Sequence, residues 1–204
     1  MTGIEVLVGH LPPEGTAAYE IRMTPKSTVY HFAVQISDVD RGVYCEEKLA
    51  VALHPSESSE FMMTRLIGWC LEHQEGIAFS RGIGSPDEPT ISTRALDGTL
   101  GLWVEIGAPS PERLHRAAKA SKRVAIYCHR AAEQVYQQLS KEPIFRGNQI
   151  SFYSFGEGFI SQLCSSLDRR NELTVSRADS MLYVVLNGVD LTSAVSERRL
   201  HEGT

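Results

Sequence analysis

The sequence from Asp97 to Tyr127, DGTLGLWVEIGAPSPERLHRAAKASKRVAIY, decides the fold that we expect for this chain. Asp97-Gly98 is a typical turn dipeptide, and residues 100–106 form an apolar run of the length of a strand. Residues 90–94, which precede the turn, have the composition of a second strand. This region therefore predicts a β-hairpin around Asp97-Gly98.

A helix and a further strand follow this hairpin. Residues 107–109, Gly-Ala-Pro, predict a tight loop, and Ser110 and Pro111 suit the N-cap and the first position of a helix. An apolar run over residues 124–129 predicts the next strand. Because strand, helix and strand succeed one another, we expect the two strands to be parallel and joined by a right-handed crossover.

Glu105 is the one carboxylate within the apolar run 100–106. Burying a carboxylate is costly unless it is paired, protonated or bound to a cation. A strand end next to the start of a helix is also where open α/β sheets often bind ligands. The pattern leaves two interpretations open: Glu105 belongs to a functional site, or it points outward from a half-exposed strand.

The composition indicates a single globular domain of 204 residues, with 42% hydrophobic and 22% charged residues. A formal net charge of −5 argues against a protein that coats nucleic acid non-specifically, but it is compatible with a local basic surface. The four cysteines form no CxxC pair, which favours free thiols in a reducing compartment. Because we find neither a long apolar run nor a secretory signal, we expect a cytoplasmic protein without membrane contact.

Hydrophobic periodicity and turn residues predict further helices and strands on both sides of the central stretch. The expected strands are 30–36, 45–53, 150–155, 173–175 and 181–186, and the expected helices begin near 56, 131 and 159. We expect one domain over residues 26–191 and a polar tail over 192–204. Residues 1–25 form an N-terminal extension: either the natural start is Met23, or the extension contains an edge strand at 4–8 or is a tail.

Further acidic residues precede two of the expected elements. Ser56 suits a helix N-cap, which places Glu57 and Glu60 three residues apart in the first turn of that helix. Asp87 and Glu88 directly precede the strand at 90–94, so the hairpin can bring them beside Glu105. The alternative interpretations are surface acids that complement the helix dipole and a solvated, proline-bounded loop.

The helix after Pro111 combines a stripe of small apolar residues with a basic surface. The stripe allows close packing on a sheet, and the basic residues form the strongest positive patch in this acidic chain. A solvated helix face is the alternative interpretation. The basic residues are Arg113, Arg116, Lys119, Lys122 and Arg123.

Three segments together resemble the YaeQ family. They are HPSESSEFMMTRL at 54–66, SPDEP at 85–89 and WVEIGAPSPERLHRAAK at 103–119, and the segment DVDRGVY at 38–44 is similar as well. The resemblance spans residues 26–191. It implies a variant of the PD-(D/E)XK nuclease fold, which is an α/β (α+β) architecture with a central mixed β-sheet flanked by helices.

The resemblance also implies a site. The helix acid would be Glu57 or Glu60, the first strand acid Asp87 or Glu88, and the second strand acid Glu105. Active nucleases of this fold carry a lysine two residues after the second acid, where this chain has Gly107. A basic group would instead come from the next helix, through Arg116 or Lys119, although an arginine cannot serve as a neutral base.

This resemblance implies one of two functions. In the first, the carboxylates hold Mg²⁺, the metal activates a water, and Lys119 or Arg116 orients that water or clamps the phosphate during hydrolysis of DNA or RNA. The expected nucleic-acid contacts are Arg113, Arg116, Lys119, Lys122 and Arg123. In the second, the chain is a non-catalytic interaction module on a degenerate nuclease fold.

Overall fold

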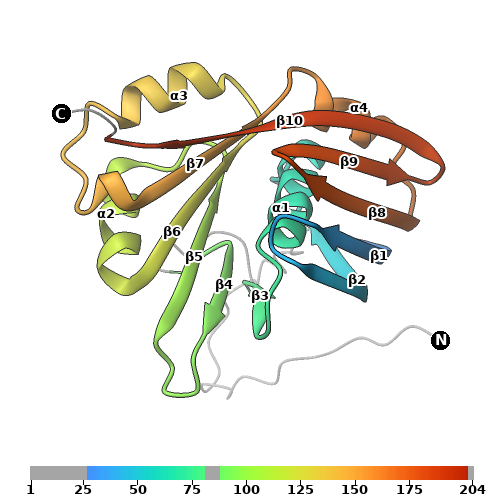
Figure 1. Ribbon diagram of the computed structural model, residues 1–204, viewed down its shortest axis with the longest axis horizontal. Helices are drawn as coiled ribbons and strands as arrows, with labels where there is room; N and C mark the ends of the chain where they lie inside the picture. Colours follow the sequence, from blue (N-terminus) through green and yellow to red (C-terminus); the bar gives the residue numbers. More distant parts are fainter. Residues whose placement is uncertain (1–26, 81–87, 202–204) are drawn as a thin grey trace, which may run out of the picture.

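The computed structural model describes residues 27–80 and 88–201, which form one sheet flanked by helices (Figure 1). The predictions for residues 1–25 lie outside the described residues. The strands are β1 (Thr28–Asp38), β2 (Val43–Leu53), β3 (Ile77–Phe79), β4 (Ile91–Arg94), β5 (Leu100–Ile106), β6 (Ser121–Cys128), β7 (Ile150–Phe155), β8 (Arg170–Ala178), β9 (Met181–Leu186) and β10 (Val189–Arg199). The helices are α1 (Ser59–Leu71), α2 (Pro111–Ala120), α3 (Ala132–Leu139), α4 (Phe159–Ser165) and the short 3₁₀ helix η1 (Gly147–Gln149).

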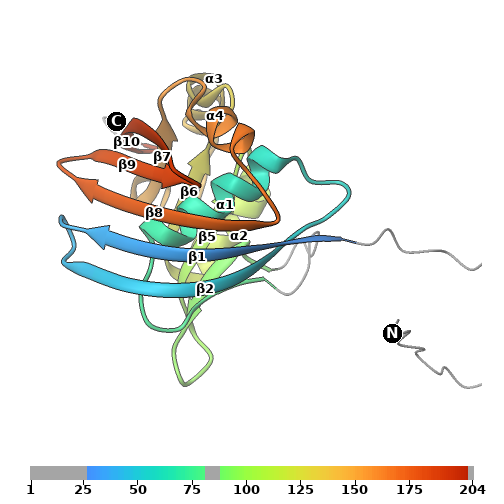
Figure 2. The same cartoon turned by 90° about the vertical axis from the view of Figure 1, so that its right-hand side faces the viewer.

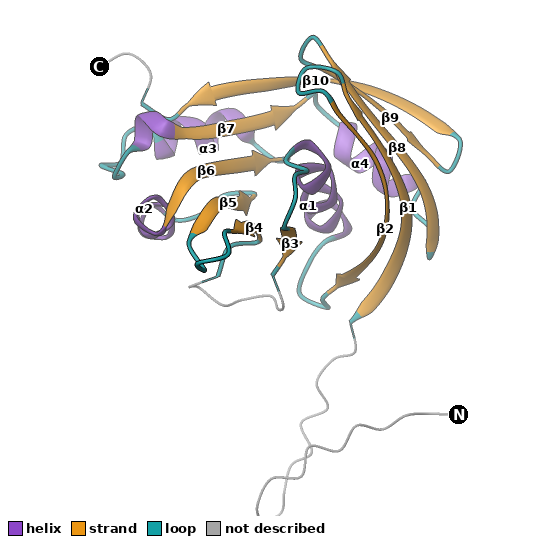
Figure 3. Cartoon of the chain, turned by 60° about the horizontal axis from the view of Figure 1, so that its bottom comes forward, coloured by secondary structure: helices purple, strands orange, loops and turns teal. Residues whose placement is uncertain are grey.

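The strands form one mixed sheet in the order β2-β1-β8-β9-β10-β7-β6-β5-β4-β3. The sheet curls around α1, with α2 and α3 on the outside of one half (Figure 3). The long strand β10 joins the two halves, because its first part pairs with β9 and its second part pairs with β7. One continuous strand therefore fixes how the two halves of the sheet are placed.

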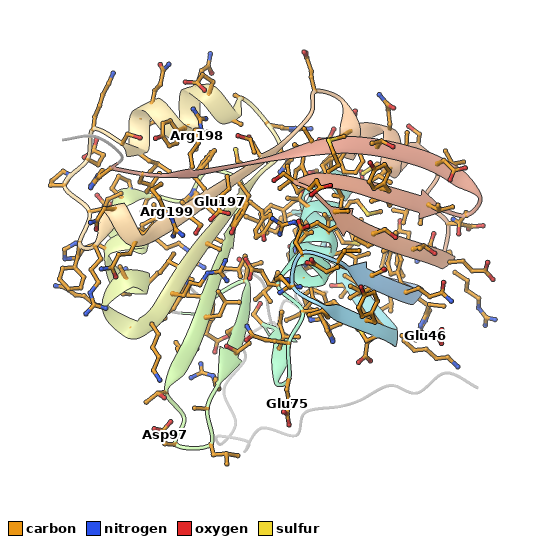
Figure 4. All side chains as sticks on the ribbon, in the orientation of Figure 1. Glu46, Glu75, Asp97, Glu197, Arg198 and Arg199 are labelled. Atoms are coloured by element: carbon orange, nitrogen blue, oxygen red, sulfur yellow. The ribbon has the colours of Figure 1, made fainter. Side chains whose placement is uncertain are left out.

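The central stretch folds as its sequence predicts. Strands β4 and β5 form an antiparallel hairpin, and Asp97 lies at its tip (Figure 4). Gly98 in that turn has a φ of +83°, a conformation that side chains other than glycine disfavour. Strands β5 and β6 are parallel and connected by α2, as expected, and β7 continues the parallel pairing.

Helix α1 begins two residues later than the sequence predicts. Its N-cap is Ser58, whose hydroxyl accepts a hydrogen bond from the amide of Phe61, whereas the expected cap was Ser56. Glu57 therefore precedes the helix, and the prediction that Glu57 and Glu60 share its first turn is wrong. The physical reason is that Ser56 is already bonded to His54 in a local turn, with 2.7 Å between Nδ1 and Oγ.

Helix α1 is also more deeply buried than its sequence pattern indicates. Every residue from Met62 to Leu71 is buried, including the polar Thr64 and Arg65. An amphipathic stripe would predict one buried face, but the curled sheet and α4 surround this helix (Figure 2). The helix is thus the centre of the larger hydrophobic core.

The prediction of a polar tail over residues 192–204 is wrong for residues 192–199, which the structure describes as a strand. Residues 192–199 belong to β10, which pairs with β9 on one edge and with β7 on the other. The prediction failed because this strand alternates: Ser193 and Val195 are buried, while the residues next to them are exposed. Backbone pairing with β9 and then with β7 holds the strand in the sheet without a long apolar run.

An ion pair between the buried carboxylate of Glu72 and the half-buried side chain of Arg123 ties the end of α1 to the sheet. The carboxylate of Glu72 accepts hydrogen bonds from both terminal nitrogens of Arg123, at 2.5 and 2.9 Å. It also accepts a hydrogen bond from the hydroxyl of Tyr127 at 2.9 Å. Burial, with the charge of Glu72 beside it, holds the pKa of Tyr127 well above its usual range, so its phenol stays protonated and donates. Arg123 also donates to the hydroxyl of Tyr153 at 3.1 Å.

We expect Glu72→Gln to lower the free energy of unfolding by about 2 kcal/mol, because the variant leaves the Arg123 guanidinium without its charge partner. Tyr127→Phe removes one hydrogen bond and should cost about 1 kcal/mol. Urea unfolding followed by circular dichroism measures both. Glu75→Gln, an exposed change just beyond α1, is the control. A Glu72→Gln loss no larger than the control loss would contradict the role of this pair.

Candidate functional site

Glu105 is buried, which excludes the interpretation that it points outward from a half-exposed strand. It is the next-to-last residue of β5 and is 3% exposed. Its Oε1 accepts the indole N–H of Trp103 at 2.5 Å and the Nε–H of Arg113 at 2.7 Å. The acid on β5 is therefore an arginine-paired carboxylate inside the protein.

The start of α2 holds Arg113 against this carboxylate. Gly107 leaves β5 with a φ of +80°, and Ser110 caps the helix by accepting the amide of Arg113 at 3.3 Å. Arg113 also donates from Nη2 to the carbonyl oxygen of Glu88 at 2.7 Å. One guanidinium thus joins the end of β5, the start of α2 and the segment that precedes β4.

Burial raises the pKa of Glu105 above its ordinary value, because the surroundings disfavour the charged form. Hydrogen bonds from Arg113, Trp103 and Thr90, and the charge of Arg113, act in the opposite direction without cancelling the effect of burial. Glu105 therefore takes up a proton more readily than an exposed glutamate does.

The other acids expected in this site pair with arginines elsewhere. The side chain of Glu57 is buried beside Arg65 of α1, 3.4 Å away, and accepts the backbone amide of His54. Glu60 at the start of α1 pairs with Arg130, which follows β6. Each of these two carboxylates thus has its own cationic partner.

The structure does not bring these carboxylates together, because they lie on opposite faces of the sheet. Trp103 packs in the core with α2, and Glu105 contacts that same side, whereas Leu102 and Val104 pack in the core around α1. Glu57 and Glu60 lie on the α1 side. Alternation of side chains along β5 produces this separation.

The remaining acids add no metal cluster to the described part of the chain. Glu88 is exposed and meets Arg113 through its backbone carbonyl, and Asp87 lies outside the described residues. Within residues 27–80 and 88–201, no three histidine, cysteine, aspartate or glutamate side chains are grouped so that they could hold a metal ion. Within these two ranges the acidic side chains therefore do not form a set of oxygen ligands for Mg²⁺.

The five predicted basic residues lie in three places, and the first of them, Arg113, is paired with Glu105. Arg116 and Lys119 are exposed on α2, and Lys122 is exposed at the start of β6. Arg123 turns to the α1 side, where it pairs with Glu72, so its assignment to the basic helix face is wrong. The reason is that α2 ends at Ala120, and neighbouring residues of the strand that follows point to opposite faces.

A segment that sequence reasoning missed extends the basic surface of α2. His115 of α2 accepts the backbone amide of Phe145 at 3.2 Å, and the two rings meet edge to face. Phe145 is 41% exposed, and the Arg146 guanidinium lies 5.1 Å from its ring centre. We call Arg116, Lys119, Lys122, Phe145 and Arg146 the basic-aromatic surface. Arg146 and Lys122 line one small hollow, so the two segments are adjacent.

Other partners in these contacts gave no signal in the sequence. Glu72 and Arg130 belong to no motif, and each meets its partner only through folding, 51 and 70 positions away in the chain. Trp103 fits an apolar strand, and nothing in that pattern marks its indole N–H as a donor to Glu105. Pairing of charged residues across such separations would be visible only in aligned relatives.

The fold defines an α+β protein whose mixed, curled sheet is flanked by helices. The sequence model that defines the YaeQ family, described as "YaeQ protein", matches residues 23–195 of this chain. The chain therefore belongs to the YaeQ family. No helix in the described part of the chain is long and apolar enough to cross a membrane.

Relatives and solved structures agree with this assignment. The YaeQ protein of Salmonella typhi is 29% identical over 163 residues, covering 79% of this chain and 90% of the relative, and that of Escherichia coli strain K12 is 28% identical over the same shares. The crystal structure of YaeQ from Xanthomonas axonopodis pv. citri matches with a TM-score of 0.80 and 26% identity, over 85% of this chain and 99% of that one. The Pseudomonas syringae structure shares the fold, with a TM-score of 0.77 and 24% identity over 84% and 95%.

We expect Arg113→Met to destabilise the fold by about 3 kcal/mol at pH 8, where Glu105 is left as an unpaired buried charge, and by much less at pH 5. A raised pKa in the folded state favours folding at low pH, and this contribution is lost as the pH rises through the folded pKa. Removing the arginine raises that pKa further and so enlarges the loss at high pH. Urea unfolding at both pH values measures the difference.

Glu105→Gln in the Arg113→Met background is the matched control, because its amide cannot titrate. The double variant should show the same unfolding free energy at pH 5 and pH 8, apart from changes shared with the wild type. A pH dependence that survives in the double variant would assign the effect to another group.

Proposed function

We propose that this protein is a non-catalytic, nucleic-acid-binding module built on a variant of the PD-(D/E)XK nuclease fold. The order of α1, the β4–β5 hairpin, α2 and β6 supports the nuclease-like assignment. In this order the helix acid, the first strand acid and the second strand acid of the family pattern follow one another. The non-catalytic assignment rests on the pairing of the candidate acids, and the binding function rests on the basic-aromatic surface.

The observation that carries the proposal is that each described candidate acid with a buried or partly buried carboxylate is paired with an arginine. These pairs are Glu57 with Arg65, Glu60 with Arg130, and Glu105 with Arg113. A magnesium site requires carboxylate oxygens that are open to the metal, and a permanently charged guanidinium repels a divalent cation. Gly107 in place of the usual lysine points the same way.

The basic-aromatic surface gives the module a means of binding. Lysine and arginine side chains neutralise backbone phosphates, and an exposed aromatic ring offers a face on which an unpaired base can stack. Arg116, Lys119, Lys122 and Arg146 supply the charge, and Phe145 supplies the ring. Because the whole chain carries a net charge of −5, binding would be confined to this surface.

We expect Lys119→Glu and Lys122→Glu each to weaken binding of a single-stranded oligonucleotide by roughly tenfold and to reduce the salt dependence of the affinity. Each charge reversal removes a phosphate contact and adds a repulsion. Fluorescence anisotropy at two salt concentrations measures the effect. Arg169→Glu, an equal charge change at an exposed position before β8, is the control. Equal losses in all three variants would contradict a localised surface.

A Mg²⁺-dependent nuclease is the second candidate, and one contact favours it. Arg113 joins Glu105 to the main chain of Glu88, so Glu88 reaches the end of β5. In this alternative Glu105, with Asp87 or Glu88 and with Glu57 or Glu60, would hold the metal. Lys119 or Arg116 would then orient water or clamp the phosphate.

Calorimetric titration with MgCl₂ separates the two candidates. We expect no saturable heat and no cleavage of single- or double-stranded DNA or RNA, because the carboxylates already have cationic partners. Saturable binding and cleavage that both disappear in Glu105→Gln would overturn the module proposal in favour of the nuclease. The Glu75→Gln variant, in which an exposed acid far from α2 is changed, is the control.

A further inference from the structure

The outer face of strands β2, β1 and β8 is a sheet surface that the site does not use. Helices α1 and α4 pack against the inner side chains of these strands, such as Phe32 and Val175, while α2 and α3 lie on the other half of the sheet (Figure 2). The alternate residues His31, Ala33 and Glu172 are exposed. This face therefore meets solvent along three neighbouring strands.

The centre of this outer face is hollow. A depression of about 620 Å³ lies over β1, and its lining residues include His31, Ala33, Lys48, Ala50, Arg170 and Glu172. Ala33 and Ala50 form its shallow floor because their side chains end at Cβ. Long side chains of a partner can enter such a depression without displacing any element of the sheet.

Charges are arranged with opposite signs on the two sides of β1. Ala33 pairs with Lys48 of β2 on one side and with Glu172 of β8 on the other, so the three residues form one row across the sheet. Lys48 and Glu172 are both exposed, and neither forms a salt bridge within residues 27–80 or 88–201. Two strand spacings, about 10 Å, separate their backbones.

We propose that this outer face is the interface of a homodimer, with a second copy of the chain related by a two-fold axis that runs along β1. Such an axis turns the partner's sheet over and exchanges its two sides. Lys48 of one copy then faces Glu172 of the other, and the pair occurs twice. An isologous interface requires this self-complementarity, and a face of one charge sign would not provide it.

The neighbouring rows fit the same axis. In the row of His31, Ala50 lies on the β2 side and Arg170 on the β8 side, so each Arg170 side chain would enter the hollow above the partner's Ala50. In the row of Gln35, Glu46 of β2 (labelled in Figure 4) would face Thr174 of the other copy, and within one copy Gln35 bonds to both side chains, at 3.3 and 3.5 Å. Charge and shape thus agree over the rows of Ala33 and His31.

Sedimentation equilibrium of the full chain tests the proposal, at concentrations from roughly 1 to 200 μM so that a moderately stable dimer can dissociate within the range. We expect twice the monomer mass at the upper end. Lys48→Glu or Glu172→Lys alone should weaken the dimer by roughly tenfold or more, because each places like charges opposite one another twice. The double variant Lys48→Glu/Glu172→Lys should recover most of the lost affinity.

Two further variants make the result independent of charge. Ala50→Trp fills the hollow on the exposed side of β2 and should prevent association while leaving the circular dichroism spectrum unchanged. Glu75→Lys, a charge reversal beyond α1, should leave the dimer intact. A monomer throughout the concentration range would overturn the proposal. A dimer that tolerates Ala50→Trp and gains nothing from the double charge exchange would do the same, since its interface would lie elsewhere.

Discussion

The structure depends on the enclosure of one helix by one sheet. A ten-stranded sheet rolled around α1 buries every residue from Met62 to Leu71, and this burial supplies the larger of the two hydrophobic cores. Burial of apolar surface is the main favourable contribution to folding. Strand β10 makes the enclosure possible, because it pairs with both halves of the sheet and fixes how they curl. The second core, between the sheet and helices α2 and α3, is smaller and contains Trp103.

Enclosing α1 also brings charged groups into the interior, and the protein balances them with arginines. Arg65 lies inside the curl beside Glu57, and Arg123 meets Glu72 at the other end of the helix. Arg113 pairs with Glu105 on the opposite face of the sheet. A guanidinium suits these positions because it stays charged when buried and donates several hydrogen bonds from a planar fork. This repeated pairing makes us favour recognition over hydrolysis for the site.

The two surfaces that we assign to binding lie on different halves of the sheet. The basic-aromatic surface belongs to α2 and to the segment before η1, whereas the proposed dimer face belongs to β2, β1 and β8. A dimer formed through the second face would leave the first exposed on both copies. Two linked copies of a weak binding surface raise the apparent affinity for a polymeric ligand without new contacts. This arrangement is consistent with an acidic protein that binds nucleic acid only locally.

The sequence alone determined the local structure of the central stretch and the family. Turn and capping residues act over a few positions, so the hairpin at Asp97-Gly98, the cap at Ser110 and the parallel crossover could be predicted from the chain. It did not reveal β10, whose polar residues resemble a tail. It also did not reveal that Ser58 is the N-cap of α1, because the local bond of Ser56 to His54 decides this. Only the tertiary structure decided which acids meet. Glu57, Glu60 and Glu105 are separated because neighbouring residues of β5 face opposite sides of the sheet, and each acid meets an arginine that the fold, and not the spacing in sequence, brings to it.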